Sequence, residues 1–168
     1  YSPLEIIISD NASTDGTKDL CVQYAEMDSR ISYVPGRSNV GATANFSNAL
    51  RIAHGEYFMW LGDDDWIDDS YVSQCMEILL GEPDVSLVCG FPKYYRMGLA
   101  DHDGKVFQLL QSSWILRVIL YYAKVTDNGM FYGLMRTSEL RRVSIPNVMG
   151  GDWHLMAKYL VKDSKYLE

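Results

Sequence analysis

The chain has 168 residues, and its 22 Asp and Glu outnumber its 15 Lys and Arg to give a formal net charge of −7. This acidic balance argues against a nucleic-acid-binding protein, because such proteins use a basic face to displace counterions from phosphates. Hydrophobic residues make up 48% of the chain and charged residues 22%, a composition typical of one globular domain over residues 1–168 rather than of a disordered chain or a membrane bundle.

The first half of the chain, residues 1–90, alternates between predicted strands and predicted helices. Three consecutive isoleucines in Leu4–Ile8 indicate a strand that is buried on both faces. Apolar residues at helical spacing predict a helix in each interval between strands, including Ala42–Ala53. This alternation predicts an α/β fold with a mainly parallel sheet covered by helices. The further strands are predicted over Ile31–Val34, Tyr57–Leu61 and Val85–Cys89.

The pattern is looser in the second half, residues 91–168. We expect a turn over Asp101–Gly104, a well-buried helix over Ser112–Lys124 and a strand over Met130–Met135. Thr137 is a candidate cap of a short helix, and Gly150-Gly151-Asp152 introduces the last helix.

Two features bear on the cellular compartment. The longest apolar stretch, Trp114–Ala123, is interrupted by Arg117 and is too short to span a bilayer, so no transmembrane segment is predicted. The cysteines at positions 21, 75 and 89 lie in apolar segments without metal-type spacing, which favours buried reduced thiols in a cytoplasmic protein.

An acidic run at the end of the third predicted strand is the strongest candidate site. Asp63, Asp64 and Asp65 follow this strand directly, and ligands of open α/β sheets bind outside the carboxyl ends of strands. Adjacent carboxylates repel one another, so either full solvation or a hard cation such as Mg²⁺ or Mn²⁺ must offset that repulsion. The alternative is a solvated acidic turn in which Asp68 or Asp69 caps the next helix.

Three other positions carry candidate functional groups, each with a structural alternative. Asp10 ends the first strand, where a carboxylate can accept hydrogen bonds from a nucleobase or a ribose. Asn39-Val40-Gly41 opens a helix whose N-terminus can receive an anionic group. Asp152 heads the last helix as a candidate general base. Turn formation and helix capping explain the same residue types equally well.

Taken in order, these motifs resemble those of the GT-A glycosyltransferases of family 2. The resemblance rests on the run Glu5–Thr17, on Asn39-Val40-Gly41 followed by Asn45-Phe46, and on Gly55-Glu56-Tyr57 leading into Leu61–Asp65. It implies a GT-A fold and binding of a nucleotide-sugar by residues 1–90, with the acceptor side in residues 91–168.

The resemblance also implies roles for individual residues. Asp10 would contact the uracil or ribose of the donor, and Asn39, Asp63 and Asp65 would help to bind the nucleotide-sugar. Asp64 falls on the position that binds Mn²⁺ or Mg²⁺ in the family. Gly151-Asp152-Trp153 resembles the acidic motif that supplies the catalytic base, which implies that Asp152 deprotonates the acceptor hydroxyl.

The sequence departs from the family pattern in two places. Gly62 stands where many members have the first Asp of the DxD motif, so that task would pass to Asp63 or Asp65. Members also begin with a strand and a helix upstream of the segment that matches Tyr1-Ser2-Pro3. We therefore expect a gap of roughly two strand spacings, ~9.6 Å, beside Leu4–Ile8, and a chain that is part of a longer enzyme unless another segment fills the slot.

The resulting hypothesis is a metal-assisted, inverting glycosyltransferase that uses a UDP-linked sugar. Its acceptor would be a glycan or lipid-linked glycan in surface polysaccharide assembly, handled in the cytoplasm or at the inner face of the membrane. Two alternatives remain: a catalytically inactive glycosyltransferase-like binding or scaffold domain, and a nucleotidyltransferase, which usually carries a Gly-rich basic loop. Trp60, Trp66 and Trp153 could stack on a sugar, although core packing is the default for such residues.

Overall fold

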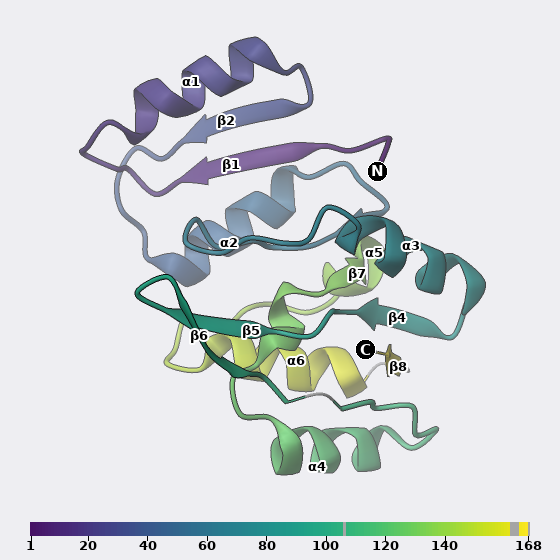
Figure 1. Ribbon diagram of the computed structural model, residues 1–168. Helices are drawn as coiled ribbons and strands as arrows, with labels where there is room; N and C mark the ends of the chain where they lie inside the picture. Colours follow the sequence, from purple (N-terminus) through teal and green to yellow (C-terminus); the bar gives the residue numbers. More distant parts are fainter. Residues whose placement is uncertain (106, 162–164, 168) are drawn as a thin grey trace.

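The computed structural model describes residues 1–105, 107–161 and 165–167 and contains two sheets and a separate hairpin (Figure 1). The first sheet pairs β1 (Ile6–Asp10) with β2 (Ile31–Pro35) in parallel, with Ile6 opposite Ile31. Helix α1 (Thr17–Met27) packs against β2, and α2 (Ala42–Ile52) packs against β1. This strand–helix alternation is the one that the sequence predicts.

The second sheet has the strand order β3-β7-β4-β8. Strand β7 is antiparallel to both of its neighbours, whereas β4 and β8 are parallel. The four residues of β4 are all buried, as expected for a central strand. The bounds of its strands are β3 Tyr57–Phe58, β4 Val85–Val88, β7 Leu134–Arg136 and β8 Lys165–Leu167.

Helices surround this second sheet, and the core lies between them and the strands. The indole of Trp60 stacks on the ring of Phe131, with centroids 4.5 Å apart and planes inclined by 2°. Aromatic pairs of this kind add about 0.5–1.5 kcal/mol beyond the area that they bury. The helical elements are α3 Tyr71–Gly81, α4 Trp114–Lys124, the 3₁₀ turn η1 Gly129–Tyr132, α5 Thr137–Leu140 and α6 Gly151–Val161.

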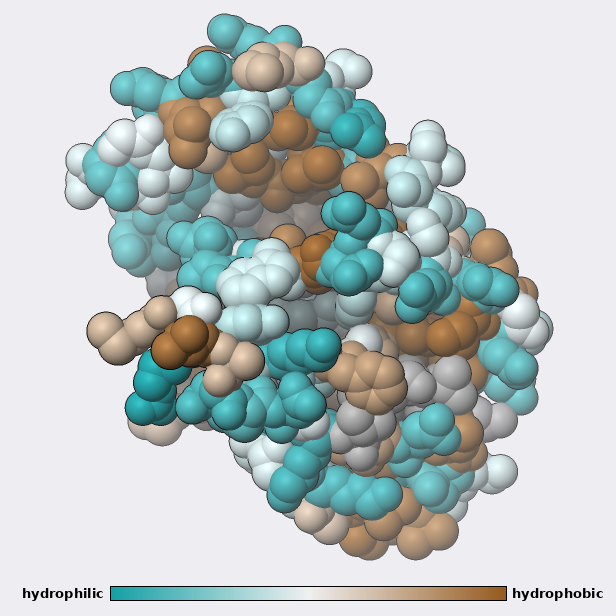
Figure 2. All heavy atoms as spheres, viewed as in Figure 1, coloured by the Kyte–Doolittle hydropathy of each residue, from teal (hydrophilic) through white to brown (hydrophobic). Residues whose placement is uncertain are grey.

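A cleft of about 490 Å³ separates β1 from β3. Strand β1 pairs with β2 and β3 pairs with β7, so within the described ranges the edges that face this cleft have no strand partner. Figure 2 shows the hollow, with apolar side chains on its rim. The expected gap beside the first strand is therefore present. Apolar lining residues include Ile7, Ala49, Phe58, Val72 and Leu134.

The cleft explains why two strand predictions are partly wrong. Residues 6–9 of β1 are half-buried rather than buried on both faces, because one side of the strand opens into the cleft. Strand β3 covers Tyr57–Phe58 instead of Tyr57–Leu61, since it pairs only with β7 and that ladder is two residues long.

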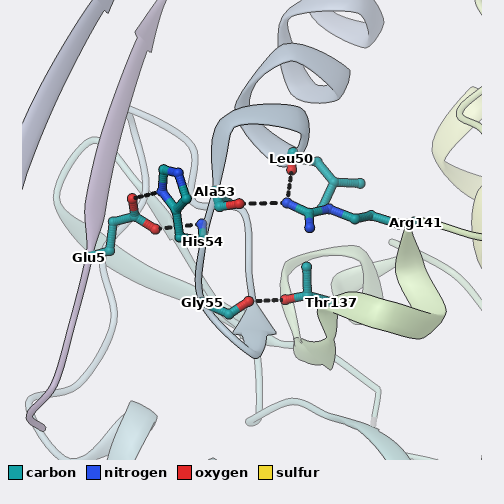
Figure 3. Close-up of polar contacts among 7 residues, drawn as sticks. All are labelled: Glu5, Leu50, Ala53, His54, Gly55, Thr137 and Arg141. Atoms are coloured by element: carbon teal, nitrogen blue, oxygen red, sulfur yellow. Dashed lines mark hydrogen bonds and ion pairs between the residues drawn. The ribbon is translucent and has the colours of Figure 1, made fainter.

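Polar contacts at the α2–β3 connection link the two sheets at the end remote from the carboxyl ends of β1 and β2 (Figure 3). The carboxylate of Glu5 accepts hydrogen bonds from the backbone N–H of His54 (2.8 Å) and pairs with its ring Nδ1 (2.9 Å), which lowers the pKa of Glu5. Thr137, expected to cap α5, is instead its first residue and donates to the carbonyl of Gly55 (2.7 Å). Arg141 donates to the carbonyls of Leu50 (3.1 Å) and Ala53 (2.5 Å).

The segment after β4 forms a hairpin where the sequence predicts a turn. Strands β5 (Lys93–Arg96) and β6 (Leu99–Asp103) pair antiparallel across Met97 and Gly98, both of which have positive φ. Two consecutive residues in this conformation make the tight turn that joins hairpin strands. The predicted turn over Asp101–Gly104 is therefore wrong, since most of it belongs to β6.

Helix α4 has the predicted position but not the predicted burial. Ile115, Ile119 and Tyr122 are 50%, 57% and 49% exposed, whereas Arg117 and Tyr121 on the opposite face are buried. The Arg117 guanidinium lies inside because it donates to backbone carbonyls of the preceding loop and of α6. The strand predicted over Met130–Met135 divides into η1 and β7.

Burial of the three cysteines is confirmed: Cys21, Cys75 and Cys89 all lie inside the fold. Within the described ranges, every helix falls short of the length and apolar character needed to cross a bilayer.

Candidate active site

Asp10 ends β1 as a buried carboxylate with donors on both oxygens. The backbone N–H and hydroxyl of Ser13 donate to Oδ1 at 2.9 and 2.6 Å, and the hydroxyl of Tyr33 donates to Oδ2 at 2.8 Å. The Ser13 hydrogen bonds, followed by that of Tyr33, lower the pKa of Asp10. The same contact raises the pKa of Tyr33 to about 12. Asp10 is therefore an ionised and fixed acceptor at the end of its strand.

Asn39 lies beside the loop that follows Asp10. Its Oδ1 accepts hydrogen bonds from the side chain of Asn11 (3.1 Å) and the backbone N–H of Gly41 (2.9 Å). Asn11 Oδ1 in turn accepts from the backbone N–H of Val40 at 2.9 Å. These reciprocal bonds join the β1–α1 loop to the start of α2, so the structure brings the Asp10 and Asn39 segments together.

The acidic run occupies an exposed turn after β3. Asp63, Asp64 and Asp65 are all solvent-exposed, and the backbone N–H of Asp65 donates to the carbonyl of Gly62 at 3.3 Å. Asp68, which accepts hydrogen bonds from the N–H and hydroxyl of Ser70, shapes the approach to α3. The exposure of Asp63–Asp65 and the contacts of Asp68 match the alternative of a solvated acidic turn, and exposure also leaves the three carboxylates accessible to a cation.

Gly62 forms a cradle beneath two of these carboxylates. A Cβ atom placed on Gly62 would lie 2.9 Å from both Asp64 Oδ1 and Asp65 Oδ2. The two carboxylate oxygens therefore lie close to the same glycine, and a hard cation such as Mg²⁺ is usually bound by one or two carboxylates together with water and substrate phosphates. Within the described ranges no group of three His, Cys, Asp or Glu is arranged to hold a metal. The residues fit a cation whose remaining ligands come from a bound diphosphate.

Asp152 lies in the first turn of α6 and is held from another segment. Its Oδ2 accepts a 2.8 Å hydrogen bond from the side-chain amide of Asn128, which precedes η1. The carboxylate is half-buried. It is also near the N-terminus of α6, where the helix dipole favours negative charge. Asp152 is thus a carboxylate with a fixed orientation.

Tyr132 in η1 is within electrostatic range of both the acidic turn and Asp152. Burial is the largest cause that raises the pKa of Tyr132, and the charges of Asp65, Asp152 and Asp64 raise it further, in that order. The charges of carboxylates from the β3–α3 loop and from α6 thus both act on this phenol. Asp10 belongs to a separate cluster with Ser13 and Tyr33, although the carboxyl ends of β1 and β2 lie on the same side as the start of α6 (Figure 1).

Sequence reasoning did not identify the tyrosines or the asparagine of this site. Tyr33, Tyr132 and Asn128 acquire their roles through contacts between distant segments, which no spacing signal marks. Of the tryptophans, Trp60 is buried in the core, as the packing default predicts. Trp66 is 67% exposed and lies against Tyr95 of the hairpin.

Comparisons with known proteins give a consistent result. The profile of the family described as Glycosyl transferase family 2 matches residues 1–144, a range that ends before Asp152. Glycosyltransferase GlyA of Streptococcus pneumoniae is 29% identical over 152 residues, which cover 89% of this chain and 20% of that protein. The chain thus spans less than half the length of the curated relatives that head the comparison.

Two solved structures share the fold over nearly the whole chain. A mannosyltransferase from Pyrobaculum calidifontis, in complex with GDP-Man and Mn²⁺, has a TM-score of 0.68 at 21% identity and covers 98% of this chain and 45% of its own. Residues 1–349 of S. aureus TarS, in complex with UDP-GlcNAc, have a TM-score of 0.69 at 19% identity and cover 97% and 46%. The predicted α/β fold of the GT-A type is confirmed.

Proposed function

Because the chain belongs to glycosyl transferase family 2, we propose that it carries the catalytic site of an inverting glycosyltransferase that uses a UDP-linked sugar and a divalent cation. The observation that carries the proposal is that hydrogen bonds fix a carboxylate in each half of the chain, Asp10 on the donor side and Asp152 on the acceptor side. Transfer needs groups on both sides that hold the donor and the acceptor hydroxyl together at the reacting carbon.

On the donor side, Asp10 accepts hydrogen bonds from the uracil imide or the ribose. Its lowered pKa keeps it ionised, and its fixed orientation reduces the entropy lost on binding. The Asn39 segment, joined to the same loop, forms the neighbouring wall. Asp63 and Asp65 complete the binding of the nucleotide-sugar from the turn after β3. The complex of TarS with UDP-GlcNAc supports the choice of UDP.

Asp64 is the proposed metal ligand, and the approach of both Asp64 Oδ1 and Asp65 Oδ2 to Gly62 makes Asp65 a candidate second ligand. A bound Mn²⁺ or Mg²⁺ would offset the negative charge of the departing diphosphate, which an acidic site could not otherwise receive. The complex of the Pyrobaculum mannosyltransferase with Mn²⁺ supports the use of a divalent cation.

On the acceptor side, Asp152 removes the proton from a hydroxyl of a glycan acceptor. The acceptor oxygen forms a bond to the anomeric carbon, the bond from that carbon to the diphosphate oxygen breaks, and the proton stays on Asp152. A single displacement of this kind inverts the anomeric configuration. The hydrogen bond from Asn128 holds the carboxylate in the orientation that this step requires.

The test is a transfer assay on the full-length protein with UDP-sugars and GDP-sugars, with and without Mn²⁺. We expect Asp152→Asn to lower kcat by at least ~100-fold, as the loss of a general base predicts, while UDP affinity changes less than twofold. Asp69→Asn, an exposed neighbour of the acidic turn that has no proposed role, is the matched control. Absence of transfer from every donor by the folded protein would favour the scaffold alternative. Pyrophosphate release from a nucleoside triphosphate would favour a nucleotidyltransferase.

A further inference from the structure

Asp152 is the last member of a hydrogen-bonded chain that begins inside the protein. The hydroxyl of Tyr121 in α4 donates to Asn128 Oδ1 at 2.7 Å, and Asn128 Nδ2 donates to Asp152 Oδ2 at 2.8 Å. Tyr121 is fully buried and Asn128 is 3% exposed. These two hydrogen bonds thus connect three segments that are distant in sequence: α4, the residue before η1, and α6.

The donor and acceptor in each of these two hydrogen bonds follow from the chemistry of the three side chains. An ionised carboxylate can only accept hydrogen bonds, so Asp152 requires the amide NH₂ group of Asn128 to face it. The amide oxygen must then face Tyr121, whose hydroxyl has to donate. Burial, with added effects of Tyr122 and Asp152, raises the pKa of Tyr121, so this hydroxyl keeps its proton. Each polar group therefore fixes the orientation of the next.

The backbone at Asn128 is adapted to this arrangement. Asn128 has φ 55° and ψ 34°, a left-handed conformation that asparagine tolerates better than most residues with a side chain. Its carbonyl accepts a hydrogen bond from the N–H of Phe131, which begins the η1 turn. A buried amide is destabilising when its hydrogen-bond partners are missing, so both Tyr121 and Asp152 are needed to keep it there.

We propose that Asn128, oriented by Tyr121, is a positioning residue that holds Asp152 with Oδ1 toward the acceptor hydroxyl. This inference rests on the proposed function of Asp152 as the base. Oδ2 is occupied by Asn128, whereas Oδ1 has no hydrogen-bond partner in the part of the chain that the structure describes. Rotation of the carboxylate would break the bond to Asn128, so the amide restricts the base to one productive orientation.

The first test removes the amide and keeps the backbone. In the full-length protein, Asn128→Gly deletes the side chain at a position whose left-handed φ glycine adopts without strain. Tyr121→Phe removes the hydroxyl alone, and Tyr122→Phe, at the half-exposed next residue, is its matched control. We expect kcat to fall by ~10–100-fold for Asn128→Gly, as poor placement of a catalytic group predicts. Tyr121→Phe should lower kcat by a smaller factor, and UDP affinity in Mn²⁺ should stay within twofold for both.

A pH profile separates positioning from general structural support. In Asn128→Asp, two carboxyl groups share the contact, and they behave as a pair that retains one proton to higher pH than an isolated carboxyl group. While the pair holds one proton, the introduced carboxyl group can donate to Asp152 as the amide does, so activity should survive at acidic pH. It should fall as pH rises and both groups ionise. Within the described residues, Tyr121 of α4 and Tyr132 of η1 are the groups whose pKa is raised by the charge of Asp152, and Asp127 is adjacent to the pair in sequence.

The outcomes distinguish the inference from the proposed function. If the wild-type protein transfers sugar but folded Asn128→Gly and Asn128→Asp keep its kcat and its pH profile, the positioning role is wrong and the function stands. If the wild-type protein transfers no sugar, the proposed function fails and the inference fails with it. A low kcat in Asn128→Gly, with unchanged UDP affinity and an acid-shifted profile in Asn128→Asp, supports the inference.

Discussion

The substitution Gly62→Ala, which adds one methyl group, tests whether Asp64 and Asp65 bind a cation together. In Gly62→Ala, the new Cβ would lie 2.9 Å from oxygens of both Asp64 and Asp65, and ordinary van der Waals contact begins at 3.4 Å. Each carboxylate must therefore retreat by about 0.5 Å, the difference between these two distances. A displacement of ~0.5 Å is the limit that functional sites tolerate, and Mg²⁺ demands near-ideal geometry.

We expect this displacement to weaken cation binding without unfolding the protein. Disturbing the groups around a metal site typically lowers affinity ~10–100-fold, which corresponds to about 1.4–2.8 kcal/mol. The φ of Gly62 is outside the left-handed range, so the alanine backbone is unstrained. The assay is calorimetric titration of Mn²⁺ into protein saturated with UDP. Gly16→Ala, where a Cβ meets nothing within 4 Å, is the matched control. Affinity of Gly62→Ala within twofold of wild type would refute the paired-carboxylate reasoning.

Two further predictions concern stability. Tyr33→Phe removes a hydrogen bond to the ionised Asp10, so it should raise the pKa of Asp10 and lower the free energy of unfolding by roughly 1 kcal/mol at neutral pH. Because that bond acts on the ionised carboxylate, the difference should be present above the ordinary carboxyl pKa and vanish as pH falls through the lowered pKa of Asp10. A difference in urea unfolding that is independent of pH would contradict this. Trp60→Ala should lower the free energy of unfolding by about 3–5 kcal/mol, because it removes the buried stack on Phe131. Trp66→Ala, at an exposed position, should change the free energy of unfolding by less than about 0.5 kcal/mol. Equal losses for the two variants in urea unfolding would show that burial does not decide the effect.

The sequence predicts those elements whose burial follows from local pattern. Strand β2, helix α2 and strand β4 lie within a residue or so of their predicted bounds, because apolar periodicity and flanking glycines mark them directly. Predictions fail where a distant segment decides the outcome. Strand β3 stops at Phe58 because its partner β7 pairs with only two of its residues. The hairpin after β4 depends on the backbone of Met97 and Gly98, which composition alone did not mark.

Helix α4 shows that apolar periodicity can identify an apolar face without predicting whether that face is buried. The spacing of Ile115, Ile119 and Tyr122 defines one apolar face, and burial of that face is the usual inference. The fold instead turns the face with Arg117 and Tyr121 inward. Arg117 donates to the carbonyl of Leu160 near the end of α6, and the hydroxyl of Tyr121 donates to Asn128. The inward face thus carries polar groups that have definite partners, which the apolar spacing alone does not predict.

The same distinction applies to the site as a whole. Sequence motifs select the carboxylates Asp10, Asp64 and Asp152, since each follows a strand or opens a helix where ligands commonly bind. Two of these carboxylates are held by residues from elsewhere in the chain, Asp10 by Tyr33 of β2 and Asp152 by Asn128, whereas Asp64 lies beside Gly62 in its own turn. A glycine or tyrosine has no recognisable signature for such a role, because its effect depends on distance and orientation. Substituting these supporting residues therefore complements removal of the carboxylates, because it keeps each carboxylate and its charge and changes only its position.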